Sequence, residues 1–441
     1  MVFKFIKYTQ PGWQFNLIPQ SQGKFPSCLV TNVQATTEIS DDRYETKSAQ
    51  LADLGYRLWN KGVLLESSYS EIAALSALPQ PTLRDEYIFI KKYWGSGWTG
   101  FAFLVRLLTF KNPFKELPAY LHTRKINRIN VEATPVCDEN YNEFIPHLIE
   151  LQPLVAVIIP TLNRYQYLKD VLLDLEKQTY TNFEVIIIDQ SDNFQQKFYD
   201  NFKLNLKVIR QEEKLLWTAR NRAIKETFAD YLLFFDDDSR VNENWIQEHL
   251  KCIDFFRSDI SAGISLSAEE QTVPLNKRYF RWADKLDSGN VMLKRNVFER
   301  IGLFDEQFNK QRMGDGEFGL RAYVNGYRSI LNYKAYRVHL KVDKGGLREM
   351  TGWDAFRPGK LFAPKPIPSM IYLYKKYFPP FLYRNAILIG MMLSNVPYKY
   401  KKNRKFLAMS AMLTVVKAPL LAIQFYRSYK MADRMLKTKT V

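Results

Sequence analysis

The run LVAVIIP (154–160) is a short apolar segment, rich in β-branched residues, that ends on a proline. Such a run is typical of a strand buried on both faces of a parallel sheet. Residues 165–178 follow with apolar side chains at helical spacing, namely Tyr167, Leu168, Val171, Leu172 and Leu175. A buried strand followed by an amphipathic helix predicts the start of an α/β domain.

Three further apolar runs continue the pattern: FEVIIID (183–189), LKVIRQ (206–211) and YLLFFD (231–236), with a helical pattern over 218–228. Strands and helices that alternate at this length predict an α/β fold with a doubly wound, mostly parallel sheet. Ligands of such sheets bind beyond the carboxyl ends of the strands. Two of the four strands end on an aspartate, Asp189 and Asp236, which either caps the next helix or faces a ligand.

The most acidic point of the region follows the fourth strand, where Asp236, Asp237 and Asp238 are consecutive. Three neighbouring carboxylates repel one another, so their clustering is costly unless a cation neutralises them. A hard divalent ion binds both carboxylate and diphosphate oxygens, and Mg²⁺ or Mn²⁺ would fit. The alternative is a solvated acidic turn without a ligand.

Taken in order, these segments resemble the family 2 glycosyltransferases. The resemblance lies in the opening strand and nucleotide loop, the second strand, the Arg-Asn motif and the DxD motif, here VIIPTLNR (157–164), IIIDQSDN (186–193), WTARN (217–221) and FFDDDSR (234–240). Each motif alone is weak, but four in order are a strong signal. The resemblance implies a GT-A fold and an inverting, metal-dependent transfer of a hexose or deoxyhexose from a nucleotide-sugar donor.

The resemblance also implies which residues hold the donor: Pro160, Thr161, Asn163, Arg164, Asp189, Arg220, Asp236 and Asp237. In this interpretation Asp189 contacts the uracil ring, which favours a UDP-sugar, and Asp236 faces the ribose. Asp238 would bind the metal, with Asp236 and His339 as further ligands. His339 ends a late predicted strand, and a satisfied core histidine is an equal alternative for it.

The second half of the resemblance covers the acceptor side. Gly289 and Asn290 mark a turn near the acceptor, and Trp353 is a candidate sugar-stacking surface, although core packing suits a tryptophan equally. GDGEFGLRAYVNGY (314–327) resembles the Glu-Asp motif at the start of the catalytic helix. That likeness makes Asp315 the base that takes the acceptor proton.

The motif departs from the family at its first position, where Gly314 stands in place of the usual glutamate. Glu317 lies on the same helical turn and would partly substitute as a catalytic residue. The alternative for both Asp315 and Glu317 is a favourable interaction with the helix N-terminus, without any catalytic role.

The whole chain has a net charge of +17, and its positive charge is concentrated near the C-terminus. From Lys360 to Val441 the sequence holds sixteen Lys or Arg and one acid, Asp433. Such a tail indicates a polyanion contact, either nucleic acid or an anionic membrane surface. Long aliphatic runs, above all 406–426, favour lipid over nucleic acid, although a helical subdomain packed on the core is the alternative.

These patterns divide the chain into residues 1–150, an accessory region of unknown role, 151–355, the catalytic domain, and 356–441, a basic helical membrane-associating tail. Within the first region, 47–78 is predicted to be helical. The tail predicts peripheral or shallow attachment to the cytoplasmic face of a bacterial plasma membrane, without a nucleic-acid partner. A saccharide or lipid-linked acceptor in cell-surface polysaccharide synthesis follows. A catalytically silent scaffold, or a nucleic-acid-binding protein using the tail, remain the alternative functions.

Overall fold

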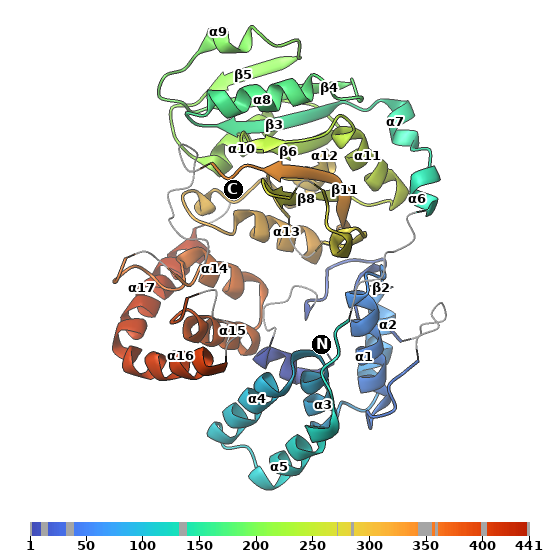
Figure 1. Cartoon of the computed structure of the whole chain (residues 1–441), viewed down its shortest axis with the longest axis vertical. Coiled ribbons are helices and arrows are strands. Elements are labelled where there is room, and N and C mark those ends of the chain that lie inside the picture. The colour runs from blue at the N-terminus through green and yellow to red at the C-terminus, as the bar shows by residue number, and fades with distance from the viewer. Residues whose placement is uncertain are drawn as a thin grey trace. The chain divides into compact units, whose positions relative to one another are not determined.

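The computed structural model (Figure 1) describes residues 2–9, 16–31, 39–131, 139–270, 272–283, 286–342, 355–357, 360–397 and 404–438. The chain forms two compact units. One comprises Met1–Glu132 together with Thr351–Lys439, and the other comprises Ala133–Met350 with the last two residues. The domain boundaries expected at 150 and 355 stay predictions.

The second unit is built on a nine-stranded sheet with the order β5-β4-β3-β6-β10-β8-β11-β7, in which β9 also pairs with β11. Four strands are mutually parallel: β3 (Val155–Thr161), β4 (Phe183–Asp189), β5 (Leu206–Arg210) and β6 (Tyr231–Phe235). The other five are β7 (Ser239–Arg240), β8 (Ile260–Ser267), β9 (Arg281–Trp282), β10 (Asn290–Lys294) and β11 (Ser329–His339). The parallel half of the sheet lies where the sequence predicts it, and the mixed α/β fold expected of a GT-A domain is confirmed.

Strand β10 introduces the mixed part of the sheet, because it runs antiparallel to both β6 and β8. Strand β11 then pairs parallel with β8 and antiparallel with β7 and β9. The register of β11 shifts between Asn332 and Tyr336. Its last residue, His339, pairs with Ser239 of β7, so the end of β11 returns to the segment that follows β6.

Helices lie on both faces of this sheet (Figure 1) because alternate strand residues point to opposite sides. In β6, the ring of Phe235 packs on Trp245 of one helix, and the ring of Phe234 packs on Phe298 of another. The helices of this unit are α6 (Glu139–Glu143), α7 (His147–Leu151), α8 (Tyr165–Leu175), α9 (Gln196–Tyr199), α10 (Leu216–Lys225), α11 (Trp245–Phe255), α12 (Arg295–Ile301) and α13 (Gly314–Val324), with short 3₁₀ turns η4 (Leu275–Lys277) and η5 (Glu306–Phe308).

The first unit is mainly helical. Its N-terminal part contains η1 (Lys4–Tyr8), β1 (Phe25–Pro26), α1 (Lys47–Asn60), β2 (Glu66–Ser67), α2 (Tyr69–Ala77), α3 (Leu83–Trp94), α4 (Ser96–Leu108), α5 (Pro113–His122) and η3 (Thr123–Lys125). The stretch 47–78, predicted to be helical, contains two helices, α1 and α2, with an interruption between them. Gly62 has a φ of 93°, which ends the first helix in a turn, and β2 then pairs with β1 before α2 begins.

The C-terminal part of the first unit contains α14 (Pro368–Tyr377), α15 (Pro380–Leu393), α16 (Arg404–Val416) and α17 (Ala418–Lys437). By length and apolar character, none of the helices in the described ranges qualifies alone as a membrane span. The segments Met409–Val416 and Ala418–Lys437 pass this test only as a pair, and they are bent by 77° at the break.

Candidate active site

The predicted donor residues gather at the carboxyl ends of three neighbouring parallel strands. Thr161 ends β3 and Asp189 ends β4, and the two are paired in register. The acidic run begins directly after β6, the neighbour of β3 on its other side. This edge is where ligands of open α/β sheets bind, so the topology places the sequence motifs in one candidate site.

Asp236 is held between two arginines that are each 1% exposed. Nη2 of Arg220 donates to Oδ1 at 3.1 Å, and Nη1 of Arg337 donates to Oδ2 at 2.7 Å. Burial acts to raise the pKa of Asp236, but the positive charges of Arg337 and Arg220 hold it well below its usual range. Asp236 is therefore an ionised carboxylate in a bridge between two buried cations.

Asp237 and Asp238 share a third arginine. Nη1 of Arg164 donates to Oδ1 of Asp237 at 3.0 Å and to Oδ2 of Asp238 at 3.1 Å. Asp237 also accepts a hydrogen bond of 2.8 Å from the hydroxyl of Thr161. Burial raises the pKa of Asp237 to about 6 even though the Arg164 charge acts to lower it. The acidic run is thus neutralised largely by arginine side chains, a source of positive charge that its sequence pattern does not reveal.

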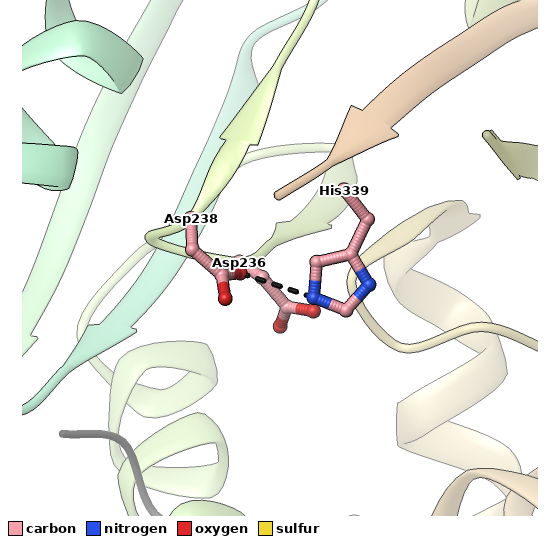
Figure 2. Close-up of side chains that lie close together, drawn as sticks. All are labelled: Asp236, Asp238 and His339. Carbon is pink, nitrogen blue, oxygen red and sulfur yellow. Dashed lines mark ion pairs between the residues drawn. The ribbon is translucent and has the colours of Figure 1, made fainter. Parts of the chain in front are cut away.

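Asp236, Asp238 and His339 form the one group of metal-ligating side chains found among the described residues. Their ligand atoms lie within 4.8 Å of one another, and Figure 2 shows the His339 ring beside the two carboxylates. Nε2 of His339 lies 3.2 Å from Oδ1 of Asp238. Burial acts to raise the pKa of Asp238, but its hydrogen bond with His339 helps to hold that pKa below its usual value.

The donor set fits a divalent cation, because it combines carboxylate oxygens with an imidazole nitrogen at short range. Asp238 and His339 are the better-suited pair. Both oxygens of Asp236 already accept hydrogen bonds from Arg220 and Arg337. The structure therefore brings together the three predicted ligands, and it favours two of them.

Arg337 belongs to the site although the sequence motifs do not include it. Its guanidinium also donates to Ser239 at 2.9 Å and to Asp287 at 2.9 and 3.1 Å. Gly289 makes room for this bridge, since a Cβ there would lie 2.1 Å from Oδ2 of Asp236. Gly289, predicted near the acceptor, thus permits the close approach of β10 to the acidic run. No local pattern identifies Arg337, since it acts across the sheet.

Asp189 is fully buried and accepts three hydrogen bonds. Its Oδ2 accepts from the hydroxyls of Tyr165 at 2.6 Å and Tyr199 at 2.7 Å, and its Oδ1 accepts from the backbone N–H of Ser191. The carboxylate therefore organises the loop after β4. A contact with a uracil ring, as the family resemblance implies, would have to reach a carboxylate that is fully buried and already accepts three hydrogen bonds.

The loop after β3 is tied to the loop after β4. Asn163 has a left-handed φ of 56°, and its side chain exchanges hydrogen bonds with Asp192 at 2.8 and 3.0 Å. Pro160 is buried within β3, two residues before the loop starts. Arg164 extends from this loop to the acidic run, where its Nη1 donates to Asp237. Its Nη2 donates to the backbone carbonyl of Val342 at 3.0 Å. The predicted donor loop is therefore hydrogen-bonded both to the loop after β4 and to the acidic run after β6.

The start of α13 meets the site through Trp217. A Cβ on Gly314 would lie 2.4 Å from the indole ring, so the family's usual glutamate has no room there. Trp217 is 4% exposed, which makes it a packing residue rather than an open sugar platform. The guanidinium of Arg220 lies 5.1 Å from the centre of that ring. Gly314, Trp217, Arg220 and Asp236 therefore form a continuous contact path from α13 to the acidic run.

Asp315 and Glu317 occupy different environments on α13. Asp315 is partly exposed, and its Oδ1 accepts from the backbone N–H of Gly316 at 2.8 Å. Glu317 is fully buried and pairs with Arg321 at 2.9 Å, one helical turn later. Only Asp315 is accessible to an acceptor, so the structure favours it over Glu317 as a base.

Two further predictions concern the acceptor side. Asn290 is fully buried. Its amide oxygen is hydrogen-bonded to the side chains of Trp245 and His249, and its amide nitrogen donates to the carbonyls of Ile264 and Ala335. These bonds commit its side chain to the fold, so its predicted acceptor contact gains no support. Trp353 lies outside the described residues.

The motif WTARN also supports the segment that leads into α13. Thr218 donates to Glu306 at 2.7 Å, and the backbone N–H of Trp217 donates to the side chain of Asn309 at 2.8 Å. Asn221 bonds both the carbonyl of Phe304 and Glu306, each at 2.9 Å. These hydrogen bonds hold the segment that leads to Asp315 against α10. The sequence motifs do not reveal that Glu306 and Asn309 are the side chains that make them.

The sheet order and the charged strand ends define a mixed α/β domain with a candidate nucleotide-binding edge. Residues 156–313 match the model of the family described as Glycosyl transferase family 2. This match confirms the resemblance that the motifs predict.

Individual relatives match over the same region. The poly(ribitol-phosphate) beta-N-acetylglucosaminyltransferase TarS of Staphylococcus aureus (strain MW2) is 29% identical over an alignment of 205 residues, and the match covers 41% of this chain and 34% of TarS. The chondroitin synthase of Escherichia coli is 25% identical over an alignment of 235 residues, and that match also covers 41% of this chain and 34% of that protein. The chain thus spans about a third of the length of these two relatives.

Among solved structures, S. aureus TarS 1–349 in complex with UDP-GlcNAc matches with a TM-score of 0.43 at 20% identity. The match covers 64% of this chain and 82% of that one. The fold assignment rests instead on the strand order of the chain itself.

Proposed function

We propose that this chain is an inverting glycosyltransferase that uses a nucleotide-sugar donor, with a UDP-sugar preferred. The observation that carries the proposal is the acidic run directly after β6, inside the family 2 match and beside the ends of β3 and β4. The relatives TarS and chondroitin synthase are named for polymers, which supports an acceptor of the saccharide or lipid-linked kind in cell-surface polysaccharide synthesis.

In this proposal the base is Asp315. Its carboxylate takes the proton of the acceptor hydroxyl while the acceptor oxygen bonds to the anomeric carbon of the sugar. The bond from that carbon to the diphosphate breaks on the opposite side, and the nucleoside diphosphate departs with its electron pair. The accessible position of Asp315 at the start of α13 supports this role, whereas the buried ion pair of Glu317 does not.

Asp238 and His339 would hold a divalent ion, Mg²⁺ or Mn²⁺, which would supply positive charge to the departing diphosphate. Arg164 contacts both Asp237 and Asp238. In this proposal its guanidinium adds positive charge beside the diphosphate. Arg220 and Arg337 fix Asp236, so they position the acidic run for the donor rather than contact the reacting atoms.

The basic tail supports attachment to the anionic cytoplasmic face of a bacterial plasma membrane. Exposed apolar side chains occur along α15, α16 and α17 among the lysines and arginines, including Leu388, Met412, Val415, Val416 and Ile423. Helices of this composition gain free energy from both apolar insertion and attraction to anionic lipids. This attachment would bring a lipid-linked acceptor to the enzyme.

The test is release of nucleoside diphosphate by the purified full chain from UDP-, dTDP- and GDP-sugars in the presence of Mn²⁺. We expect slow donor hydrolysis with one nucleotide class, and its loss in Asp315→Asn. If a folded protein binds a nucleotide but releases none from any donor, even with saccharide acceptors present, the chain is a catalytically silent scaffold. No binding of any nucleotide would contradict the proposal altogether.

A further inference from the structure

A second candidate site lies in the first unit, far along the chain from the family motifs. The segment that precedes α14, the residues just after α15, Lys417 and the first part of α17 line an open cavity of about 550 Å³. Four basic side chains line it: Arg357, Lys360, Lys365 and Lys417. Among the residues that the structure describes, the lining contains no acidic and no aromatic side chain.

The walls of this basic cavity are built by contacts between segments distant in the sequence. Arg357 donates to the carbonyls of Leu393, at 2.9 Å, and Val396, which ties the segment before α14 to the end of α15. Gln424 of α17 donates to the carbonyl of Leu361 and accepts from the backbone N–H of Lys365. The cavity is therefore pre-formed, which lowers the cost of ordering it around a ligand.

The C-terminal part of the first unit offers few carboxylates to the basic cavity. The one acid in the sequence from Ala355 to Val441 is Asp433, and its carboxylate bonds Lys375. Lys360 and Lys417 are exposed, and neither pairs with a carboxylate among the described residues. Positive side chains around one space repel one another, so an anion bound between them relieves the repulsion.

The basic cavity is also partly apolar, because Leu361, Leu420 and Leu421 share its lining. Leu361 is 65% exposed, and the exposed residues Val415 and Val416 directly precede Lys417. A free phosphate ion would leave this apolar surface in water. A nucleic acid would be expected to stack its bases on aromatic side chains, and the described part of the lining contains none.

We propose that the basic cavity binds the phosphate or diphosphate group of a lipid, with the lysines on the phosphate and the leucines on the first part of the apolar chain. A lipid headgroup meets both halves of the lining. The proposal concerns the first unit alone, so it stands or falls separately from the transferase activity of the second.

The test is calorimetric binding of a short-chain phosphatidic acid, kept below its micelle concentration, to the full chain. Short-chain phosphatidylcholine and inorganic pyrophosphate serve as the comparison ligands. We expect the phosphatidic acid to bind at least about tenfold more tightly than either. The variant Lys360→Ala/Lys417→Ala should weaken this binding by about tenfold or more, because each charge is worth about a factor of five near an anionic group.

The matched control is Lys430→Ala/Lys437→Ala, which removes the same charge from exposed positions of α17 outside the basic cavity. It should bind as the wild type does, and Lys360→Arg/Lys417→Arg should retain binding. If both alanine variants weaken phosphatidic acid binding equally, the proposed site is wrong and the lipid is attracted by the overall positive charge of the tail. Pyrophosphate binding as tightly as phosphatidic acid would overturn the lipid assignment. Thermal unfolding of each variant confirms that it is folded.

Discussion

Arg337 and Asp236 form a buried ion pair, in which Nη1 of the arginine donates to Oδ2 of the aspartate at 2.7 Å. The two residues are 101 positions apart in the sequence. Through this pair, the late strand β11 holds the first carboxylate of the acidic run in place. Arg337 also binds Asp287, so one guanidinium organises carboxylates from two loops.

Removal of Arg337 should therefore be costly. In Arg337→Met, Asp236 loses one of its two arginines and Asp287 loses the ion pair found for it in the described structure, so we expect a loss of about 3–5 kcal/mol in the free energy of unfolding. Denaturant unfolding measures this loss. Arg337→Met/Asp287→Asn should recover part of it, because one uncompensated charge is removed. Wild-type stability of Arg337→Met would show that the pair does not matter.

Gly314 and Gly316 offer a matched pair on α13. A Cβ at Gly314 would lie 2.4 Å from Trp217, whereas a Cβ at Gly316 would have its nearest contact at 3.5 Å, on the flexible end of Met313. We expect Gly314→Ala to destabilise the protein by about 1–3 kcal/mol and to weaken donor binding through displacement of Arg220. Gly316→Ala should be neutral or stabilise the helix by about 0.5–1 kcal/mol.

Thermal unfolding and nucleotide binding of the two glycine variants test this difference. Trp217→Leu should reduce the cost of Gly314→Ala, since the indole is the group that the new methyl meets. Equal effects of the two alanine substitutions would contradict the packing explanation for the missing glutamate.

Asp315 and Glu317 should separate activity from stability. Asp315→Asn removes the proposed base, and we expect turnover to fall by at least about 100-fold while nucleotide affinity is retained. Glu317→Gln breaks a buried pair with Arg321 and should lower stability by about 1–3 kcal/mol, with turnover affected far less. Steady-state kinetics alongside thermal unfolding distinguish the two. If Glu317→Gln lowers turnover more than Asp315→Asn does, Glu317 is the base and Asp315 is not.

The sequence was sufficient for the parts of the fold that depend on local patterns. The apolar runs at 154–160, 183–189, 206–211 and 231–236 predict β3 to β6 with errors of one residue at the ends. The start of α13 and the end of β11 at His339 were also predicted. The strands follow from the apolar pattern that each segment carries by itself, whereas the start of α13 follows from the resemblance to the family's Glu-Asp motif.

Contacts between distant segments were not predictable in this way. The acidic run indicates a cation, and the sequence cannot show that Arg164, Arg220 and Arg337 supply much of the positive charge. Likewise, Gly314 looks like a lost glutamate until the indole of Trp217 is seen against it. Such relationships depend on tertiary packing, and only the folded chain reveals them.

The first unit should show a stability that depends on pH through Glu86. Its carboxylate accepts from the backbone N–H groups of Lys4 and Phe5, and burial raises its pKa from 4.5 to about 7. The folded state then holds a proton that the unfolded chain releases. The stabilising contribution is full below pH 4.5 and is lost as the pH rises to about 7, by roughly 3 kcal/mol.

Denaturant unfolding of wild type and Glu86→Gln at a series of pH values checks this dependence. The difference in unfolding free energy between the two proteins should change between pH 4.5 and about 7 and be constant at higher pH. A difference that is independent of pH would show that folding does not raise the pKa of Glu86.

The proposed metal site requires that Asp238 and His339 hold a divalent ion that binds a nucleoside diphosphate. The most direct measurement is calorimetric binding of UDP to the full chain with Mn²⁺ or with a chelator, for wild type, Asp238→Ala and the exposed control Asp200→Ala. We predict binding that needs Mn²⁺, is lost in Asp238→Ala and is unchanged in Asp200→Ala. Equal UDP affinity in the presence of the chelator, or in Asp238→Ala, would contradict the claim and assign the diphosphate to the arginines alone.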